Sequence, residues 1–170
     1  MARNKTKLTH LDANNRPTMV DVGAKTATYR EASAEATVKL PPAVARALAR
    51  AGHRTKKGPV FDTAIVAGVM AAKRTHEFIP FCHPLALERC SIDIATRPGG
   101  VIHIVCNVAV HHKTGVEMEA LTGATAAALT IYDMCKALSH DIEIGAVRLL
   151  RKTGGKRDFA RKPTRPKRRA

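Results

Sequence analysis

The amino-acid sequence predicts an α+β sandwich, in which helices pack on an antiparallel sheet. Two observations lead to this fold class. Residues 88–97 and 101–112 both alternate apolar and polar side chains, and Pro98-Gly99-Gly100 joins them, which is typical of a β-hairpin. A helix predicted over about residues 116–139 contains thirteen consecutive residues without formal charge, nearly all of them small or apolar. Such a helix is expected to be largely buried.

The chain before the hairpin predicts two extended segments and two helices. Residues 18–22 and 26–40 read as extended, the second because apolar side chains alternate along it. Residues 41–52 form a helix with a proline in the first turn and a glycine just past the end. Residues 58–78 form another helix, and its apolar side chains lie nearly all round, so it is expected to be buried.

Residues 144–152 are expected to form a closing strand. If the two early helices count as one crossover, the order is β-α-β-β-α-β with an extra helix, the ferredoxin-like sandwich. We expect a basic N-terminal arm over residues 1–7, a single α+β domain over residues 8–157 and a basic, disordered C-terminal tail over residues 158–170. A chain of 170 residues suits one domain and buries roughly 70% of its unfolded surface.

The positive charge is concentrated at the ends of the chain. The net charge is +15, from 29 Lys and Arg against 14 Asp and Glu; the first seven residues contribute +3 and the last ten +6, which leaves +6 for residues 8–160. The tail is either a solubilising segment or an anchor for nucleic acid and other polyanions. The basic body is compatible with an anionic ligand.

The cysteines and the hydropathy pattern predict a soluble, cytoplasmic protein. Cys82, Cys90, Cys106 and Cys135 form no C-x-x-C pair and follow no secretory leader, which favours reduced thiols. The longest uncharged helical run has thirteen residues, well short of the ~20 that span a bilayer. No membrane association is expected.

Asp133 and Lys136 interrupt the apolar helix one turn apart, so they share a face and are predicted to form an ion pair. A salt bridge on a solvated stripe is one explanation. The helix has few other polar positions, however, so both side chains are expected to lie partly inside the protein, where their pKa values would be perturbed and the lysine could transfer protons.

Glu117 and Glu119 lie near the start of the same helix, where acidic residues commonly interact with the helix dipole. Glu119 and Asp133 are fourteen residues apart, which places them within ~40° of one face but ~21 Å apart along the axis. One compact reacting centre in a single chain cannot contact both. Either a long ligand spans them or two subunits each contribute one end, and the second interpretation is favoured because this face is poor in large side chains.

Pro80 and Pro84 bracket Phe81-Cys82-His83, which predicts a loop. His83 is expected either to hold a phosphate or carbonyl group or to be structural. No second Cys and His cluster at zinc spacing is present, so no metal site is predicted. Cationic groups occur around Lys57, in residues 73–74 and in residues 148–156. Several such groups beside an acid and a histidine favour a polyphosphate ligand over a metal.

Four segments resemble the MoaC family of cyclic pyranopterin monophosphate synthases. They are LTHLDANNRPTMVDVGAKTATYREASAEA, KKGPVFDTAIVAGVMAAKRTHEFIPFCHPL, KTGVEMEALTGATAAALTIYDMCKAL and GAVRLLRKTGGK, and the resemblance covers about residues 8–157. It implies a ferredoxin-like catalytic domain and a lyase of molybdenum cofactor biosynthesis. The implied reaction converts 3',8-cyclo-7,8-dihydro-GTP, a cyclised GTP derivative, to cyclic pyranopterin monophosphate and releases pyrophosphate. It also implies a homohexamer, a trimer of dimers with sites at the dimer interface.

The resemblance also assigns site residues. The catalytic residues that it implies are Asp133, Lys136 and Lys57. The substrate-binding residues that it implies are Phe81, Cys82, His83, Glu117, Met118, Glu119, Lys152 and Arg30. Pro59 stands where the family commonly has an acid and Asp62 where it often has alanine. We expect no tightly bound cofactor, although Mg²⁺ held by the substrate triphosphate stays open.

Two other function classes remain to be weighed. A nucleic-acid-binding protein acting through its basic tail is the main alternative, but the chain lacks a surface of stacking aromatic residues and any recognised binding motif. A metal-dependent hydrolase built on the His and Cys residues has the least support.

Overall fold

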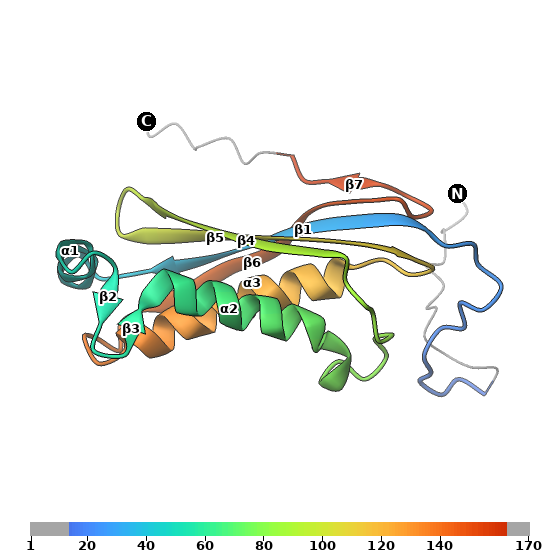
Figure 1. Cartoon of the computed structure of the whole chain (residues 1–170), viewed down its shortest axis with the longest axis horizontal. Coiled ribbons are helices and arrows are strands. Elements are labelled where there is room, and N and C mark those ends of the chain that lie inside the picture. The colour runs from blue at the N-terminus through green and yellow to red at the C-terminus, as the bar shows by residue number, and fades with distance from the viewer. Residues whose placement is uncertain (1–13, 163–170) are drawn as a thin grey trace, which may run out of the picture.

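The sheet of this protein has five antiparallel strands. A computed structural model describes residues 14–162. The strands are β1 (Thr28–Lys39), β4 (Arg89–Arg97), β5 (Val101–His112), β6 (Glu143–Thr153) and β7 (Phe159–Ala160). Their order is β4-β5-β1-β6-β7, and every neighbouring pair is antiparallel (Figure 1). The first four strands thus follow the ferredoxin-like order, which confirms the predicted fold class.

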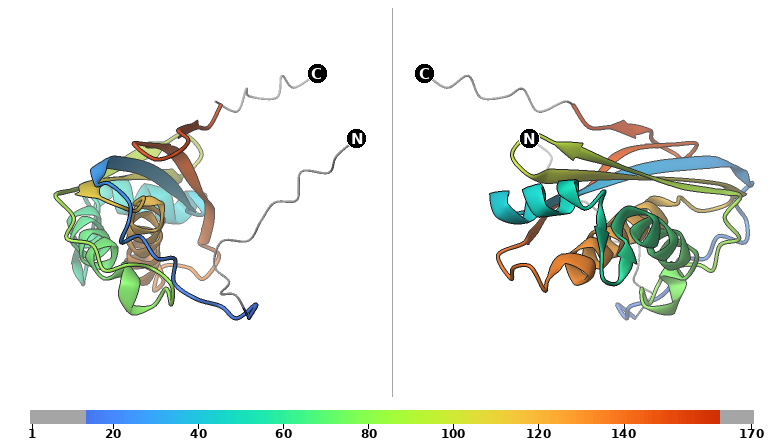
Figure 2. Two further views of the ribbon diagram at one scale, coloured as in Figure 1. Left: turned by 90° about the vertical axis from the view of Figure 1, so that its right-hand side faces the viewer. Right: turned by 60° about the vertical axis from the view of Figure 1, so that its left-hand side comes forward.

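The helices cover one face of this sheet (Figures 1 and 2). They are α1 (Pro42–Arg50), α2 (Val60–Lys73) and α3 (Glu117–Cys135). A short hairpin of β2 (Arg54–Thr55) and β3 (Gly58–Pro59) links α1 to α2, and a 3-10 helix, η1 (Thr75–Glu77), follows α2. Figure 2 shows α2 and α3 side by side beneath the sheet, with α1 at its end as the extra helix.

The core consists mainly of small side chains. Ala32, Ala34, Ala36 and Val38 of β1 alternate with polar residues, and each is at most 2% exposed. Small residues also bring the helices close together: a Cβ atom on Gly68 of α2 would lie 2.7 Å from the Gly123 carbonyl oxygen of α3. On its other side, a Cβ atom on Gly123 would lie 2.6 Å from Cys106 Sγ in the sheet. α3 therefore packs closely against both α2 and the sheet.

The opposite face of the sheet is polar. Glu31 and Glu35 project from the central strand β1. Glu31 pairs with Arg89, and Glu35 lies 2.5 Å from Arg148 Nε and 2.6 Å from His103 Nε2. Because cationic side chains of other strands donate a hydrogen bond to each carboxylate, this face holds acids on the central strand at low cost.

Several predicted boundaries differ from the structure. Residues 18–22 form no strand, and the helix predicted over residues 58–78 ends at Lys73. The long helix predicted to end near residue 139 ends at Cys135. β7 lies beyond the predicted domain boundary at residue 157 and pairs with Arg151 and Lys152. The predicted N-terminal arm and the tail from residue 163 on lie outside the described residues. Between residues 14 and 162, the structure contains no helix suited to crossing a bilayer.

Candidate functional site

Asp133 lies near the C-terminal end of α3 between two lysines. Lys136 Nζ is 2.8 Å from Asp133 Oδ1, and Lys57 Nζ is 2.6 Å from Asp133 Oδ2. Lys57 also donates to the Asp133 main-chain carbonyl at 3.0 Å. It comes from the turn between β2 and β3, which lies beside this end of α3 (Figure 1). The i, i+3 pair predicted from sequence is confirmed, and Lys57 completes a cluster of three residues.

The charges of this cluster are fixed by its hydrogen bonds. Those from Lys136 and Lys57 lower the pKa of Asp133 to about 2, and the bond to Asp133 raises the pKa of Lys136. Asp133 is therefore ionised and Lys136 protonated at neutral pH. The expectation of burial is wrong for the single chain, because the Asp133 and Lys136 side chains are 53% and 49% exposed. The lysine pKa accordingly moves upward rather than toward neutrality.

A second group of predicted residues surrounds the start of α3. Glu119 is only 4% exposed. Burial, together with the negative charge of Glu117, raises the pKa of Glu119 to about 7. Glu117 itself accepts a 2.7 Å hydrogen bond from Lys152 Nζ of β6. The pKa of Cys82 is raised by burial and by the charge of Glu119, which places the Cys82 thiol within electrostatic reach of this carboxyl group.

The predicted loop containing Phe81, Cys82 and His83 follows the 3-10 helix η1. The Cys82 main-chain nitrogen donates to the Ile79 carbonyl oxygen at 3.0 Å. His83 Nε2 lies 2.9 Å from the Val20 carbonyl oxygen, and because a carbonyl only accepts, Nε2 carries the hydrogen. His83 thereby fixes the segment before β1.

A small polar pocket of about 90 Å³ lies beside Glu117. It is lined by Arg30, Glu31, Gly115, Glu117, Lys152, Thr153, Gly155 and Lys156. The predicted binding residues Arg30, Glu117 and Lys152 thus come together. Lys156 is an additional lining residue that the sequence marked only as part of a basic cluster. The Gly154-Gly155 pair before it was the available signal, because consecutive glycines often permit close backbone approach.

The two groups of residues lie at opposite ends of α3. Asp133 and Glu119 are fourteen positions apart, which corresponds to ~21 Å along the helix axis. The structure therefore brings Lys57, Asp133 and Lys136 together at one end, and Glu117, Glu119 and Lys152 at the other. It does not bring the two ends together within one chain, as the helix geometry predicted.

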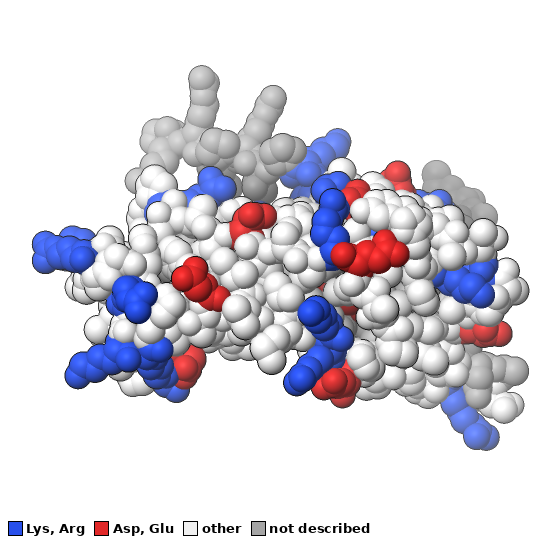
Figure 3. Space-filling model, in the orientation of Figure 1, with Lys and Arg blue, Asp and Glu red and all other residues white. Residues whose placement is uncertain are grey.

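Between the two ends the helices expose an apolar surface. An open groove of about 290 Å³ is lined by Ala71, Phe78, Ile79, Met118, Leu121, Thr122, Thr125, Ala126 and Leu129. Leu129 and Phe78 are 56% and 57% exposed, and Val66 and Met70 of α2 are 58% and 50% exposed. Figure 3 shows a face with wide uncharged areas between scattered charges, and α2 crosses this face in Figure 1. We refer to the nine groove residues together with Val66 and Met70 as the apolar helix face.

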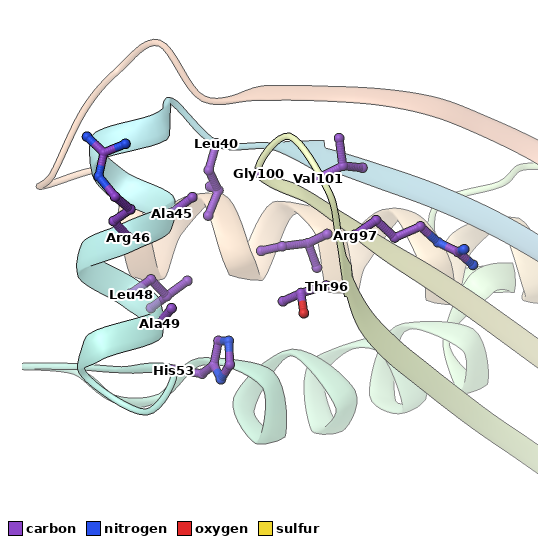
Figure 4. Close-up of a pocket in the computed structure, with 11 residues that line it drawn as sticks. Leu40, Ala45, Arg46, Leu48, Ala49, His53, Thr96, Arg97, Gly100 and Val101 are labelled. Carbon is purple, nitrogen blue, oxygen red and sulfur yellow. The ribbon is translucent and has the colours of Figure 1, made fainter.

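Another cavity, of about 330 Å³, lies between α1 and the tip of the β4–β5 hairpin (Figure 4). Its lining is mainly apolar, and it includes none of the predicted site residues. The guanidinium groups of Arg46 and Arg97 point away from this space in Figure 4, and His53 is stacked on Phe61 with 4.5 Å between ring centroids. No set of polar groups converges here. The part of the chain that the structure describes also contains no cluster of three His, Cys, Asp or Glu residues suited to a metal ion.

Comparison with known proteins agrees with the resemblance seen in the sequence. A protein-family model described as MoaC family matches residues 19–155. The chain belongs to the MoaC family. The match includes every residue of both site groups, from Arg30 to Lys152. It ends before β7, so this strand lies outside the part that the MoaC family model covers.

Relatives of this MoaC chain carry informative names. A protein of Xanthomonas campestris pv. campestris (strain B100) named cyclic pyranopterin monophosphate synthase is 57% identical over 153 residues, which are 90% of this chain and 93% of that protein. A molybdenum cofactor biosynthesis bifunctional protein of Synechocystis sp. is 48% identical over 159 residues, 91% of this chain and 46% of that protein. Molybdenum cofactor biosynthesis protein 1 of Drosophila melanogaster is 48% identical over 161 residues, which are 94% of this chain and 28% of that protein.

The raised pKa of Glu119 predicts how stability depends on pH. In the unfolded chain the carboxyl group loses its proton around pH 4.5, whereas in the folded chain it keeps the proton until about pH 7. The free energy of unfolding therefore falls as pH rises through this window and levels off above it. Glu119→Gln cannot ionise, so we expect this variant to gain roughly 2 to 3 kcal/mol over wild type on going from pH 4 to pH 8.

Urea unfolding of both proteins at pH 4 and pH 8 measures this difference. Glu77→Gln is the matched control, because Glu77 is exposed and its pairing with Arg74 spans 4.0 Å. A stability difference between Glu119→Gln and wild type that is the same at both pH values would contradict the buried, protonated carboxyl group.

Proposed function

We propose that this chain catalyses the conversion of 3',8-cyclo-7,8-dihydro-GTP to cyclic pyranopterin monophosphate, with release of pyrophosphate, as a lyase of molybdenum cofactor biosynthesis. The observation that carries the proposal is the Lys57–Asp133–Lys136 cluster, found in a chain 57% identical to a protein named for this activity. The cluster offers two cationic proton donors at a site of net positive charge. The polyanionic substrate requires such a site.

The chemistry requires proton transfers and stabilisation of charge on a phosphate chain. A sugar hydroxyl oxygen attacks the α-phosphorus and forms the cyclic phosphate, while the bond to the β-phosphate oxygen breaks and pyrophosphate leaves. The hydroxyl proton must be accepted, and the purine-derived ring must open and close again through further proton transfers. A lysine ammonium group can stabilise the phosphate charge, give its proton to the departing pyrophosphate oxygen, and then, as the free amine, accept the hydroxyl proton.

The three catalytic residues take different roles. Asp133, with a pKa of about 2, is a poor base at neutral pH. Its role is to hold the two lysine ammonium groups 2.6 and 2.8 Å from its carboxylate oxygens, where each can face the substrate. Lys57 and Lys136 are the proton-transfer groups. Exclusion of water by bound substrate would strengthen the charge interactions of this cluster.

The substrate-binding residues lie at the other end of α3. Phe81, Cys82 and His83 provide the loop, Glu117, Met118 and Glu119 the start of the helix, and Lys152 and Arg30 the cations. Glu119 is buried and protonated up to about pH 7, so it can donate a hydrogen bond to a neutral ring as well as accept one. This end therefore combines hydrogen-bonding groups for the pterin-forming ring system with two cations, Arg30 and Lys152, that can contact phosphate groups.

The complete site is formed by two subunits. The ~21 Å between Asp133 and Glu119 separates the two halves in one chain, and the apolar helix face lies between them. A twofold axis near the middle of α3 would cover this face and place the Asp133 end of one protomer beside the Glu119 end of its partner. We therefore propose a dimer with two shared sites, which assembles as a trimer of dimers.

The catalytic assignment predicts large losses of activity. Asp133→Asn removes the charge that holds both lysines, and Lys136→Gln or Lys57→Gln removes a proton carrier. We expect each to lower kcat at least about a hundredfold. The assay incubates the protein with the cyclised GTP intermediate and measures pyrophosphate and cyclic pyranopterin monophosphate. Lys39→Gln, an exposed lysine at the end of β1, is the control and should act like wild type. Wild-type turnover by Asp133→Asn would refute the role given to this residue.

The shared site predicts complementation between inactive variants. Asp133→Ala damages one end of α3 and Lys152→Ala the other. In a mixed dimer one site carries both substitutions and the other carries neither, so random pairing should restore about a quarter of wild-type activity. Coexpression followed by the pyrophosphate assay measures this recovery. If each chain held a complete site, the mixture would be no more active than the variants alone.

We also propose that Mg²⁺, when it participates, is held through the substrate phosphates and not by a protein site. The protein is first treated with a chelator and then given substrate together with excess Mg²⁺. If the protein holds no metal of its own, turnover should equal that of untreated protein immediately. A slow recovery, or a stoichiometric metal found in the purified protein by elemental analysis, would contradict this proposal.

A further inference from the structure

The turn between β6 and β7, residues 154–158, brings a lysine to the small polar pocket beside Glu117. Lys156 lines this pocket together with Arg30 and Lys152. Lys152 Nζ forms an ion pair with Glu117 Oε1 at 2.7 Å, and Arg30 donates its Nε hydrogen to the His112 carbonyl oxygen at 3.2 Å. Within residues 14–162, Lys156 forms no ion pair. Its positive charge is thus uncompensated.

The acids of the pocket do not neutralise this charge. Glu31 pairs with Arg89 and, at 3.7 Å, with Arg151, and neither arginine lines the pocket. Glu117, the other lining acid, pairs with Lys152. Both carboxylates therefore already form ion pairs with other residues, while Arg30 and Lys156 leave an excess of positive charge in a space of about 90 Å³. A small, partly enclosed space with this charge favours an anion.

The backbone of the turn is held in place by two hydrogen bonds at Gly154. This residue has φ +82, and a side chain here would collide with the Tyr29 carbonyl oxygen, so only glycine fits. Its carbonyl oxygen accepts a 2.8 Å hydrogen bond from the Thr28 hydroxyl, and its N–H donates to Asp158 Oδ1 at 3.2 Å. A Cβ atom on Gly155 would lie 2.9 Å from Arg30 Nη1, so the guanidinium group rests against this second glycine.

β7 closes the turn from the far side. Phe159 pairs with Lys152, the residue that carries one of the pocket cations. Just after the strand, Arg161 donates its main-chain N–H to the Leu150 carbonyl oxygen at 2.7 Å and its Nε hydrogen to the Leu149 carbonyl oxygen at 2.9 Å. These bonds anchor the end of the hairpin. Without them β6 would be an edge strand at the pocket, and the turn with Lys156 would lack its second support.

We propose that Lys156 is a further substrate-binding residue, which contacts the phosphate chain, and that Asp158 and β7 position it. The identity of the anion as the triphosphate of the cyclised GTP derivative rests on the proposed function; the presence of an anion site does not. Lys156, Asp158 and β7 lie beyond residue 155, where the family match ends.

The first test compares Lys156→Gln with Arg157→Gln in the full-length protein. Arg157 is the neighbouring exposed cation and does not line the pocket. Loss of a charge-assisted contact made in both ground state and transition state should raise KM for the cyclised GTP derivative about tenfold while kcat stays within about twofold. The Kd for inorganic pyrophosphate, measured by calorimetry, should rise by a similar factor. Lys156→Arg, which keeps the charge, should lose less affinity than Lys156→Gln on both measures, and Arg157→Gln should stay within about twofold of wild type.

The second test separates positioning from charge at Asp158. If Asp158 acts through its hydrogen bond to Gly154, then Asp158→Ala should weaken pyrophosphate binding several-fold, and Asp158→Asn, which keeps an acceptor oxygen, should restore it. If the carboxylate instead acts only by its negative charge, both variants should bind pyrophosphate more tightly than wild type. That second result would overturn the positioning role.

The outcomes distinguish this inference from the proposed function. If wild type turns over the cyclised GTP derivative and Lys156→Gln has unchanged KM and pyrophosphate affinity, the inference is wrong and the proposed function stands. If wild type shows no turnover but binds pyrophosphate, and Lys156→Gln weakens that binding, the anion site stands and the proposed function fails.

Discussion

The packing of α3 is the constraint on which the rest of this structure depends. Alanines and glycines let the helix lie in close contact with both α2 and the sheet, so its position relative to them is fixed by tight packing. Asp133 and Glu119 lie on this helix ~21 Å apart along its axis. Any chemistry that needs both must therefore bring in a second molecule. The exposed apolar surface between the two residues supplies a reason for a second protomer to bind there.

The two ends of the helix are also electrostatically different. At one end an ionised aspartate between two lysines gives an exposed cluster of net positive charge. At the other a carboxyl group is buried so deeply that its pKa rises to about 7. The first environment attracts and stabilises phosphate groups, while the second offers hydrogen bonds to a ring beside the cationic pocket that Lys156 lines. A substrate that joins a triphosphate to a purine-derived ring requires both environments within one site.

The sequence predicted the elements with strong periodic patterns. The β4–β5 hairpin and the Asp133–Lys136 contact follow from periods that local geometry determines. Lys57 reaches Asp133 from 76 positions away, so no local spacing predicts that contact; only the family resemblance pointed to it. Asp133 is more exposed than the apolar pattern of α3 predicts, because its end of the helix is not covered within the single chain. β7 has two residues and therefore no period to detect, and residues 18–22 are held by His83 instead of by strand pairing.

The most direct measurement is a structure of the Asp133→Ala variant with the cyclised GTP derivative bound. The account predicts a ligand lying across two protomers, in contact with Lys57 and Lys136 of one chain and with Glu119, the Phe81–His83 loop and Lys156 of the partner. A ligand whose contacts all come from a single chain, with the apolar helix face left open to solvent, would contradict it.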